Sequence, residues 1–198
     1  MRPTAAIILA AGLSRRMGTA KLLLPIDGAP MLQRTLDLVA AFPFARTILV
    51  TIPMVAQKVK TSAQVIINPT PEAGQSSSLR LGVLAANLGE SLLFLTGDQP
   101  FLDRETLSAI LEADDGQSIA YPETAEGLPR NPTLFAPRFR AELLALTGDI
   151  GGRQLRNRHP EACRPVQVPD EKTLMDVDTP EEYQTVLRMI ERNIGGQQ

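Results

Sequence analysis

The sequence has few of the residues that build disulfide frameworks and soft-metal sites. Its 198 residues include one cysteine, Cys163, one histidine, His159, and no tryptophan. A single cysteine excludes an internal disulfide and is what a cytoplasmic protein would show. One cysteine and one histidine cannot complete the ligand set of a structural zinc site. Any metal is therefore expected to be a hard ion held by oxygen, such as Mg²⁺.

A surplus of positive charge and a long apolar run are also missing. The formal net charge is −2, which gives no support for nucleic-acid binding. No apolar run approaches the ~20 residues of a membrane-spanning helix, and the apolar segment near the N-terminus is too short for a signal peptide. We therefore expect a cytoplasmic protein without nucleic-acid or membrane partners. The length favours one domain, placed at residues 1–192, with 193–198 as a disordered tail.

Apolar runs alternate with helical patterns through the first half of the chain. The runs predict buried strands, and the 3.6-residue spacing between them predicts helices. This alternation indicates an α/β fold with a mainly parallel sheet, in which ligands bind beyond the carboxyl ends of the strands. The expected strands are 5–9, 47–52, 65–67 and 92–95, and the expected helices are 31–40, 78–86 and 107–111.

The second half is less regular. Short strands are expected at 118–121, 133–135 and 164–168, and a helix at 139–146 is interrupted by a Gly-rich stretch, 147–152. The last helix opens at Asp178-Thr179-Pro180, where a cap residue precedes a proline in the first turn.

The loop after the first strand combines small residues with positive charge. A backbone without bulky side chains lets N–H groups approach a ligand, and basic side chains balance phosphate charge. The loop therefore suits a polyphosphate, although an ordinary βα turn with solvated basic residues would look alike. It is not a P-loop or a dinucleotide loop, because its glycines, Gly12 and Gly18, have neither spacing. The residues concerned are Leu9, Ala10, Ala11, Gly12, Ser14, Arg16 and Lys21.

Acidic residues follow two apolar segments. Asp98 comes directly after the strand 92–95, between Gly97 and a proline, so it is a candidate Mg²⁺ ligand or else a turn residue that caps the next helix. Asp176 and Asp178 follow Leu174-Met175, and either could be a second ligand. Asp178 competes for another role, as the N-cap of the last helix.

Polar side chains also gather around a predicted strand end and helix start. Asn68, Gly74, Ser77 and Ser78 could read a base edge or a ribose, or could form a turn and a helix cap. His159 has a polar surrounding and is expected on the surface. Without a partner set for it, catalysis by a Ser/His/Asp triad is not expected.

Taken together, these residues resemble the MobA-like nucleotidyltransferases, and within them the molybdenum cofactor cytidylyltransferases. Five elements carry the resemblance, in order along the chain. They are Leu9–Leu23 (L-A-[AG]-G-x-S-x-R-M-G-x-x-K-L-L), Asn68-Pro69 to Ser78-Leu79, Gly97–Pro100 (G-D-[QM]-P), Gly148–Arg153 (G-D-x-G-x-R) and Asp176–Tyr183.

The resemblance implies a Rossmann-like three-layer sandwich of the nucleotide-diphospho-sugar transferase type. It also implies transfer of a nucleoside monophosphate from an NTP to a phosphorylated acceptor, with release of pyrophosphate. By the same resemblance, Arg16 and Lys21 neutralise phosphate charge, and Asp98 binds Mg²⁺ together with Asp178. The implied nucleotide contacts are Leu9, Ala10, Ala11, Gly12, Ser14, Lys21, Asn68, Gly74, Ser77, Ser78 and Gly97.

The base and the acceptor are also expectations from the resemblance. Ala11 stands where guanylyltransferases of the family usually carry glycine, which favours CTP, and the acceptor is expected to be molybdopterin, for delivery to a molybdoenzyme. Arg130 replaces the glycine of the family's R-G-[HN]-P segment, so the acceptor pocket differs. The alternatives are GTP, a different phosphorylated acceptor, and a non-catalytic protein that binds nucleotide or pterin for delivery.

Overall fold

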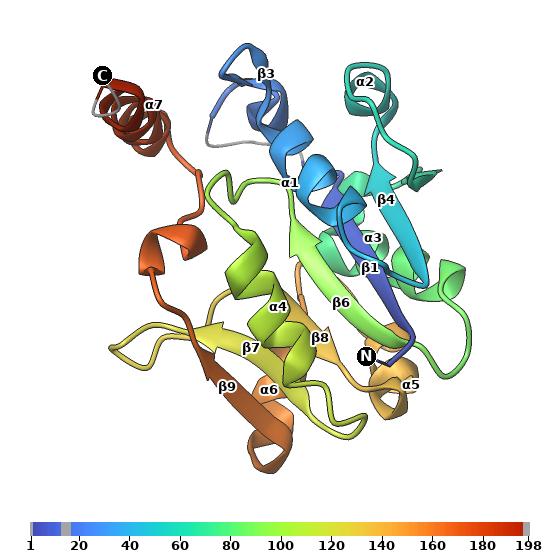
Figure 1. Cartoon of the computed structure of the whole chain (residues 1–198). Helices are drawn as coiled ribbons and strands as arrows, with labels where there is room; N and C mark the ends of the chain where they lie inside the picture. The colour runs from blue at the N-terminus through green and yellow to red at the C-terminus, as the bar shows by residue number, and fades with distance from the viewer. Residues whose placement is uncertain (1, 13–16, 196–198) are drawn as a thin grey trace.

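The structure is a computed structural model that describes residues 2–12 and 17–195 (Figure 1). Over these residues, seven strands form one sheet in the order β5-β4-β1-β6-β8-β7-β9, and two short strands form a hairpin, β2–β3. The strands are β1 (Thr4–Ala10), β2 (Pro25–Ile26), β3 (Ala29–Pro30), β4 (Arg46–Thr51), β5 (Gln64–Ile67), β6 (Ser91–Thr96), β7 (Ile119–Glu123), β8 (Thr133–Phe135) and β9 (Cys163–Gln167).

Helices alternate with these strands along the chain. The α-helices are α1 (Met31–Ala40), α2 (Pro53–Ala56), α3 (Gln75–Ala85), α4 (Arg104–Glu112), α5 (Arg140–Leu144), α6 (Arg153–Arg158) and α7 (Pro180–Gly195). Short 3₁₀ helices are η1 (Lys21–Leu23), η2 (Pro71–Ala73), η3 (Pro137–Phe139), η4 (Pro160–Ala162) and η5 (Glu171–Leu174).

The central strands are apolar on both faces. Helices therefore cover each face of the sheet, and the fold has three layers. In β1, Ala5 and Ile7 join the apolar cluster that includes α3, α5 and α6, whereas Ala6 and Ile8 join the cluster that includes α1 and α4. Successive side chains of a strand point to opposite faces, so a continuous apolar run needs a cover on each side. Figure 1 shows the sheet between these two helical layers.

The strand directions bring several loops to one edge of the sheet. β1 is parallel to β4 and β6, and β7 is parallel to β9, but β8 is antiparallel to both of its neighbours. The loops after β1 and β6 therefore leave the same edge side by side. In open α/β sheets, this edge is where ligands bind.

The last helix lies away from the sheet and packs on the hairpin (Figure 1). Val186 and Ile190 of α7 share a small apolar cluster with Ile26 and Met31. The Tyr183 hydroxyl donates a hydrogen bond to the Pro25 carbonyl at 2.6 Å. This packing fixes the C-terminal segment beside the loops that follow β1 and β6.

The predicted fold class, a Rossmann-like sandwich with a mainly parallel sheet, is confirmed. Each strand that we predicted is present, with bounds that differ from the prediction by at most two residues. The hairpin β2–β3 and helix α6 were not predicted. The helix α7 runs through residues 193–195 of the predicted tail, and 196–198 lie outside the described residues. None of the described helices is long and apolar enough to cross a membrane.

Candidate functional site

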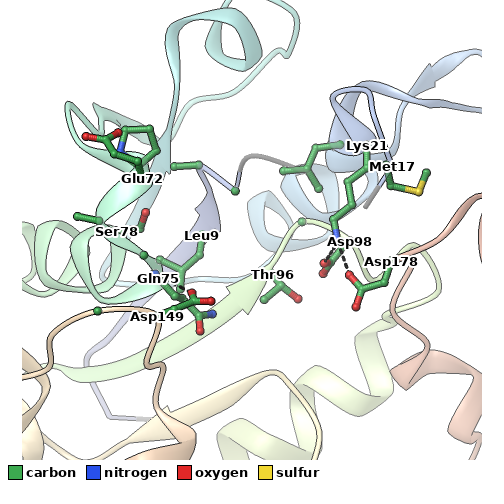
Figure 2. Close-up of a pocket in the computed structure, with 18 residues that line it drawn as sticks. Leu9, Met17, Lys21, Glu72, Gln75, Ser78, Thr96, Asp98, Asp149 and Asp178 are labelled. Atoms are coloured by element: carbon green, nitrogen blue, oxygen red, sulfur yellow. Dashed lines mark hydrogen bonds and ion pairs between the residues drawn. The ribbon is translucent and has the colours of Figure 1, made fainter. Parts of the chain in front are cut away.

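A cleft of about 580 Å³ opens at the carboxyl ends of β1 and β6 (Figure 2). Its floor is made by Leu9 at the end of β1 and Thr96 at the end of β6. Polar groups stand on the two opposite walls. One wall carries Lys21, Asp98 and Asp178, and the other carries the start of α3 and the loop at 148–149.

Three charged side chains meet on the first wall. The Lys21 ammonium lies 2.6 Å from Oδ2 of Asp98 and 2.7 Å from Oδ1 of Asp178. Side-chain exposure is 14% for Lys21, 17% for Asp98 and 36% for Asp178. Charge-assisted hydrogen bonds of this length are stronger than neutral ones, so the three groups hold one another in place.

Backbone contacts hold the two acidic segments together. The Val177 amide donates to the Asp98 carbonyl at 2.9 Å. The buried Gln99 amide donates to the carbonyls of Asn131 and Leu174, at 3.1 and 3.3 Å. Because Gln99 follows Asp98 directly, these bonds join the loop after β6 to the segment that carries Asp178.

The glycine before Asp98 is required by packing. A Cβ at Gly97 would lie 2.6 Å from Cδ1 of Leu32 and 3.3 Å from Leu22. Since both leucines are buried, the loop lies tightly against α1 and η1. Any larger residue would push the Asp98 loop away from these elements.

Asp178 is not the cap of the last helix, which corrects the role that competed for it. The Thr179 hydroxyl accepts from the Glu182 amide at 3.2 Å, and the Glu182 carboxylate accepts from the amides of Asp178 and Thr179. This reciprocal arrangement is a capping box with Thr179 at the N-cap. The Asp178 carboxylate is thereby left to face Lys21.

The electrostatics of the wall follow from this crowding. Burial lowers the pKa of the Lys21 ammonium, but the charges and hydrogen bonds of Asp98 and Asp178 outweigh burial, and the pKa is raised. Asp176 lies beside the same group. Burial, and then repulsion by Asp98 and Asp178, raise the pKa of Asp176 to about 7, against the opposing effect of Arg130 and Lys21.

The first wall has the chemistry of a site for a hard divalent cation. Oδ1 of Asp98 is buried and has no hydrogen-bond partner among the residues that the structure describes. An open carboxylate oxygen beside a second carboxylate suits Mg²⁺, which usually takes one or two carboxylates plus phosphate oxygens. Within the described ranges, no cluster of three or more acidic, histidine or cysteine residues forms a metal site of its own. A bound phosphate would therefore complete the ligand set.

The second wall is made by two segments that are distant in sequence. Gly74 adopts φ +91°, and a Cβ there would lie 2.5 Å from the Gly148 carbonyl carbon. The Asp149 carboxylate accepts a hydrogen bond from the backbone N–H of Gln75 at 3.3 Å. The Gly148 carbonyl accepts one from the backbone N–H of Ser76 at 3.2 Å. The loop at 148–149 thus satisfies the first amides of α3.

Some predicted nucleotide contacts support this wall from behind. The Asn68 side chain is buried and donates to the hydroxyls of Ser77 and Ser78, at 2.8 and 2.9 Å. Its oxygen accepts from the Thr70 amide at 2.9 Å. Asn68 and Ser77 do not line the cleft, whereas Ser78 does. The serines lie within α3, which begins at Gln75, so they are not its cap.

The other predicted site residues divide into three groups. Those that line the cleft are Leu9, Ala11, Gly12, Lys21, Gly74, Ser78, Gly97, Asp98 and Asp178. Ala10 is buried at the end of β1 and does not line it. Ser14 and Arg16 lie outside the described residues.

His159 lies far from this chemistry. Its ring nitrogens contact the carboxylates of Glu142 and Glu161, at 2.9 and 3.3 Å. It does not line the cleft, in agreement with the expected surface position. Among the described residues, no histidine is therefore available to act as a base in the cleft.

The sequence reasoning missed Gln75 and Asp149 as cleft residues. The two are 74 positions apart, so no spacing rule joins them. The signals present were Gly74 and Gly148, which both take positive φ. Only the fold shows that these two turns lie against each other.

Comparison with known proteins places this geometry in a family. Residues 6–163 match the family described as the MobA-like NTP transferase domain. The matched region contains Lys21 and Asp98, and Asp178 lies beyond it. The sequence is 31% identical over 196 residues to the purine catabolism protein PucB of Bacillus subtilis, covering 92% of this chain and 95% of that one.

Two further sequence relatives are more partial. A probable molybdenum cofactor guanylyltransferase of Methanosarcina acetivorans is 27% identical over 160 residues, covering 75% of this chain and 69% of that one. The bifunctional protein GlmU of Rhodospirillum rubrum is 34% identical over 122 residues, or 57% of this chain. The match spans only 26% of the length of GlmU.

Solved structures share the fold along nearly the whole chain. A homologue, from Mycobacterium sp. strain JC1, of the Mycobacterium tuberculosis protein Rv0371c aligns with a TM-score of 0.85 at 27% identity, covering 97% of this chain and 99% of that one. Rv0371c itself, in a complex with manganese, aligns with a TM-score of 0.78 at 25% identity, covering 95% and 99%.

Proposed function

The chain belongs to the family of MobA-like NTP transferases, and from that premise we propose that it moves CMP from CTP to the terminal phosphate of molybdopterin and releases pyrophosphate. The observation that carries the proposal is the group of Lys21, Asp98 and Asp178 at the edge of the cleft. A protein that only binds and delivers nucleotide or pterin would have no need of this acidic pair.

The two walls suggest the direction of the bound nucleotide. The triphosphate lies towards Lys21, whose ammonium balances phosphate charge, and the base lies towards the start of α3 and Asp149 (Figure 2). The small residues Ala11 and Gly12 line the cleft between the walls, where a side chain would otherwise obstruct the ribose and phosphates. The α-phosphorus is then held near the acidic pair.

The second wall supports a base that has an exocyclic amine. The side-chain amide of Gln75 can donate and accept hydrogen bonds, and the Asp149 carboxylate can accept them. Cytosine offers an amine and two acceptors to such a wall, whereas uracil has no amine. Ala11 lines the cleft and stands where guanylyltransferases of the family usually carry glycine, so the resemblance favours CTP. We therefore favour CTP over GTP.

The reaction needs alignment and charge neutralisation more than proton transfer. A phosphate monoester has a second pKa near ~6 and is mostly dianionic at neutral pH, so the acceptor phosphate attacks the α-phosphorus without a base. The bond to pyrophosphate breaks as the new phosphoanhydride bond forms. Lys21 stabilises the charge that develops on the leaving pyrophosphate, and the cleft holds attacker and leaving group in line.

Mg²⁺ fits this site, with Asp98 and Asp178 as its protein ligands. When bound, the ion would supply charge neutralisation at the phosphates. The neighbour described with manganese supports a divalent ion of this kind. Asp98 and Asp178 hold the position, and Gln99 keeps their two segments together.

The acceptor assignment is supported by the relative named as a probable molybdenum cofactor guanylyltransferase. The same name favours a second candidate function, which is the same transfer with GTP. In either case the reaction would be cytoplasmic, and a molybdoenzyme would receive the product. The exposed Arg130 lies where its charge acts on Asp176, on the expected acceptor side of the acidic pair.

The decisive experiment measures pyrophosphate release with Mg²⁺ and molybdopterin, comparing CTP, GTP, ATP and UTP. Each nucleotide is also tested without molybdopterin, which gives the rate of transfer to water. Release with CTP that depends on molybdopterin is the expected result. Release with GTP alone would show that the proposed base is wrong, and it would favour the second candidate function.

If no pyrophosphate is released with any nucleotide, the Tm of the protein with each nucleotide separates the remaining alternatives. If CTP raises the Tm of the protein but no pyrophosphate appears, the nucleotide site stands and molybdopterin is the wrong acceptor, or the protein is a delivery protein. The variant Arg130→Gly then tests whether this side chain blocks the acceptor. If no nucleotide changes the Tm, the proposal is wrong.

A further inference from the structure

The geometry points to a second role for Lys21: its ammonium bonds both Asp98 and Asp178, and it has to leave both carboxylates before they can hold a divalent ion. Lys21 then turns to the triphosphate. This inference rests on the proposed function for the identity of the nucleotide, but not for the exchange of cations itself. It assigns two successive positions to one side chain.

Lys21 bonds one oxygen of each carboxylate, so a metal that bridges the two acids would share them with the ammonium, whether it binds Asp98 through Oδ2 or through the unpartnered Oδ1. The ammonium bonds Oδ2 of Asp98 at 2.6 Å and Oδ1 of Asp178 at 2.7 Å (Figure 2). Mg²⁺ would stand ~2.1 Å from a carboxylate oxygen. An ion that used the same two oxygens would therefore lie within a few ångströms of the ammonium.

Charge makes such close neighbours unfavourable. Lys21 and Asp98 are mostly shielded from solvent, at 14% and 17% exposure. At a partly buried site, water screens like charges poorly, so the ammonium and a divalent ion repel one another. The ion and the ammonium would therefore compete for the same two carboxylates.

The side chain of Lys21 has another place to go. It lines the cleft, and its flexible four-carbon stem carries a compact charge that can rotate towards a ligand there. A triphosphate in the cleft would bring new negative charge within its reach. The ammonium can therefore exchange its contacts with the carboxylates for contacts with the triphosphate, which leaves the carboxylates to the ion.

The expected consequence is that metal and nucleotide bind cooperatively. The protein alone should bind divalent ions weakly, because Lys21 competes with them for the acidic pair. With a triphosphate present, the competition disappears and metal affinity rises. Removal of the lysine charge should therefore strengthen metal binding to the protein alone, although the same change damages catalysis.

The test is a Mn²⁺ titration of the purified protein without nucleotide, in which electron paramagnetic resonance measures the free ion. Wild type is compared with Lys21→Met, which keeps the length of the side chain without its charge. We expect the variant to bind Mn²⁺ at least roughly ten-fold more tightly, as removal of a neighbouring unit charge predicts. Affinity equal to that of wild type, or lower, would overturn the inference.

Three controls make the result specific. Lys58→Met changes net charge equally at an exposed position away from the cleft, and should leave Mn²⁺ affinity unchanged. Lys21→Arg keeps the charge and should bind Mn²⁺ as weakly as wild type. The double variant Asp98→Asn, Lys21→Met should lose the gain. An equal gain in Lys58→Met would show a general charge effect and contradict the inference.

A titration with nucleotide tests the second position of the lysine. With a CTP analogue whose α,β bridge is a methylene group, wild type should bind Mn²⁺ more tightly than Lys21→Met, reversing the order. A persistent advantage of the variant would refute the move to the triphosphate. If Lys21→Met does not fold, Lys21→Gln, which retains a hydrogen-bond donor, takes its place in both titrations.

The inference and the proposed function can fail separately. The titration without nucleotide involves no transfer reaction, so it tests the cation exchange even if the base or acceptor is wrong. Pyrophosphate release tests the reaction even if Lys21 never leaves the carboxylates.

Discussion

Asp98 is the residue on which the chemistry of the cleft depends most. Its Oδ2 bonds Lys21, and its buried Oδ1 is open to a cation. We predict that Asp98→Asn abolishes pyrophosphate release in Mg²⁺, because the amide removes the charge. Lys21→Ala should lower turnover on the order of 10²- to 10³-fold, as loss of one transition-state contact commonly does.

The same assay provides the control for both variants. Asp27→Asn removes an exposed carboxylate that pairs with Arg34 outside the cleft, and it should keep full activity. Near-normal turnover of purified Asp98→Asn or Lys21→Ala would contradict the assigned roles.

Gly74 shows how a single backbone position shapes the second wall. Its φ of +91° strains any other residue, and a Cβ would lie 2.5 Å from the Gly148 carbonyl carbon. We predict that Gly74→Ala lowers the free energy of unfolding and raises KM for CTP, because the loop at 148–149 must shift. Chemical denaturation and pyrophosphate release measure the two effects.

Gly89→Ala is the matched control for Gly74→Ala. Gly89 has φ +84°, but a Cβ there would meet nothing within 4 Å among the described residues. Its strain alone should cost about 1 kcal/mol and leave KM unchanged. Gly74→Ala should cost at least ~1 kcal/mol more, since overpacking adds to strain. Equal effects of the two changes would show that the contact with Gly148 is unimportant.

The functional role of a single residue was predictable where the neighbouring sequence alone indicated it. Asp98 stands in the loop after the apolar strand β6, and Lys21 belongs to the basic segment that follows β1; both line the cleft as expected. Gln75 and Asp149 were not assigned to the cleft, since their proximity depends on tertiary packing between distant turns. Asn68 looked like a ligand contact, but its amide is occupied by the hydroxyls of α3. Its role as a direct contact to the nucleotide stays a prediction.

Among the elements, α7 offers a clean test of its capping box. The Thr179 hydroxyl accepts from the Glu182 amide, and the Glu182 carboxylate returns the contact to two amides. We predict that Thr179→Ala lowers the free energy of unfolding by about 1 kcal/mol, the usual cost of losing an N-cap. Thermal denaturation measures the change.

The cap also orients the acidic residue before it. Thr179→Ala should therefore raise the Mg²⁺ concentration needed for half-maximal turnover, because half of the capping box that orients Asp178 is lost and only the bond from the Asp178 amide to Glu182 remains. Thr179→Ser keeps the hydroxyl and should restore both properties. A Thr179→Ser protein as impaired as Thr179→Ala would argue against the capping box.

Elements were predictable when their pattern was long and apolar. The buried strands β1, β4 and β6 were found because both faces are covered and their runs are continuous. The hairpin β2–β3 was missed because it has two residues per strand, and α6 because six mostly polar residues after a Gly-rich stretch resemble a loop. These short elements are fixed by their neighbours rather than by their own periodicity.

At the scale of the whole molecule, His159 couples stability to pH. It joins Glu142 of α5 to the segment before β9, and the hydrogen bond to Glu142, with that to Glu161, raises the pKa of the imidazole above 6.5 despite some burial. A raised pKa in the folded protein contributes stability below the ordinary value, which is lost as pH rises through the raised one. Stability should therefore fall as pH rises above the ordinary pKa of histidine, 6.5, and through the raised one.

The variant His159→Asn isolates this effect. Calorimetry should show wild type with the higher Tm at about pH 6, and a difference that becomes smaller as pH rises through the raised pKa and the imidazole loses its proton. A difference in Tm that is constant across this range would show that the histidine contributes through packing on Phe139 instead.

The overall architecture could be predicted more fully than its strand order. Alternating strands and helices predicted a mainly parallel sheet, which the pairing of β1 with β4 and β6 confirms. The antiparallel insertion of β8 between β6 and β7 was not predictable, because its three residues carry no sign of direction. That insertion brings the β7–β8 connection, with Arg130, towards the acidic pair.

The dependence of the acidic pair on α7 has a consequence for biosynthesis. Lys21 and Asp98 belong to the first half of the sequence, but Asp178 stands just before the helix that docks on the hairpin β2–β3. A ribosome delivers that helix after every strand of the sheet, because β9 precedes it in the sequence. The strands therefore leave the ribosome before the second carboxylate does, and a chain that stopped before Asp178 would lack one of the two acids that contact Lys21.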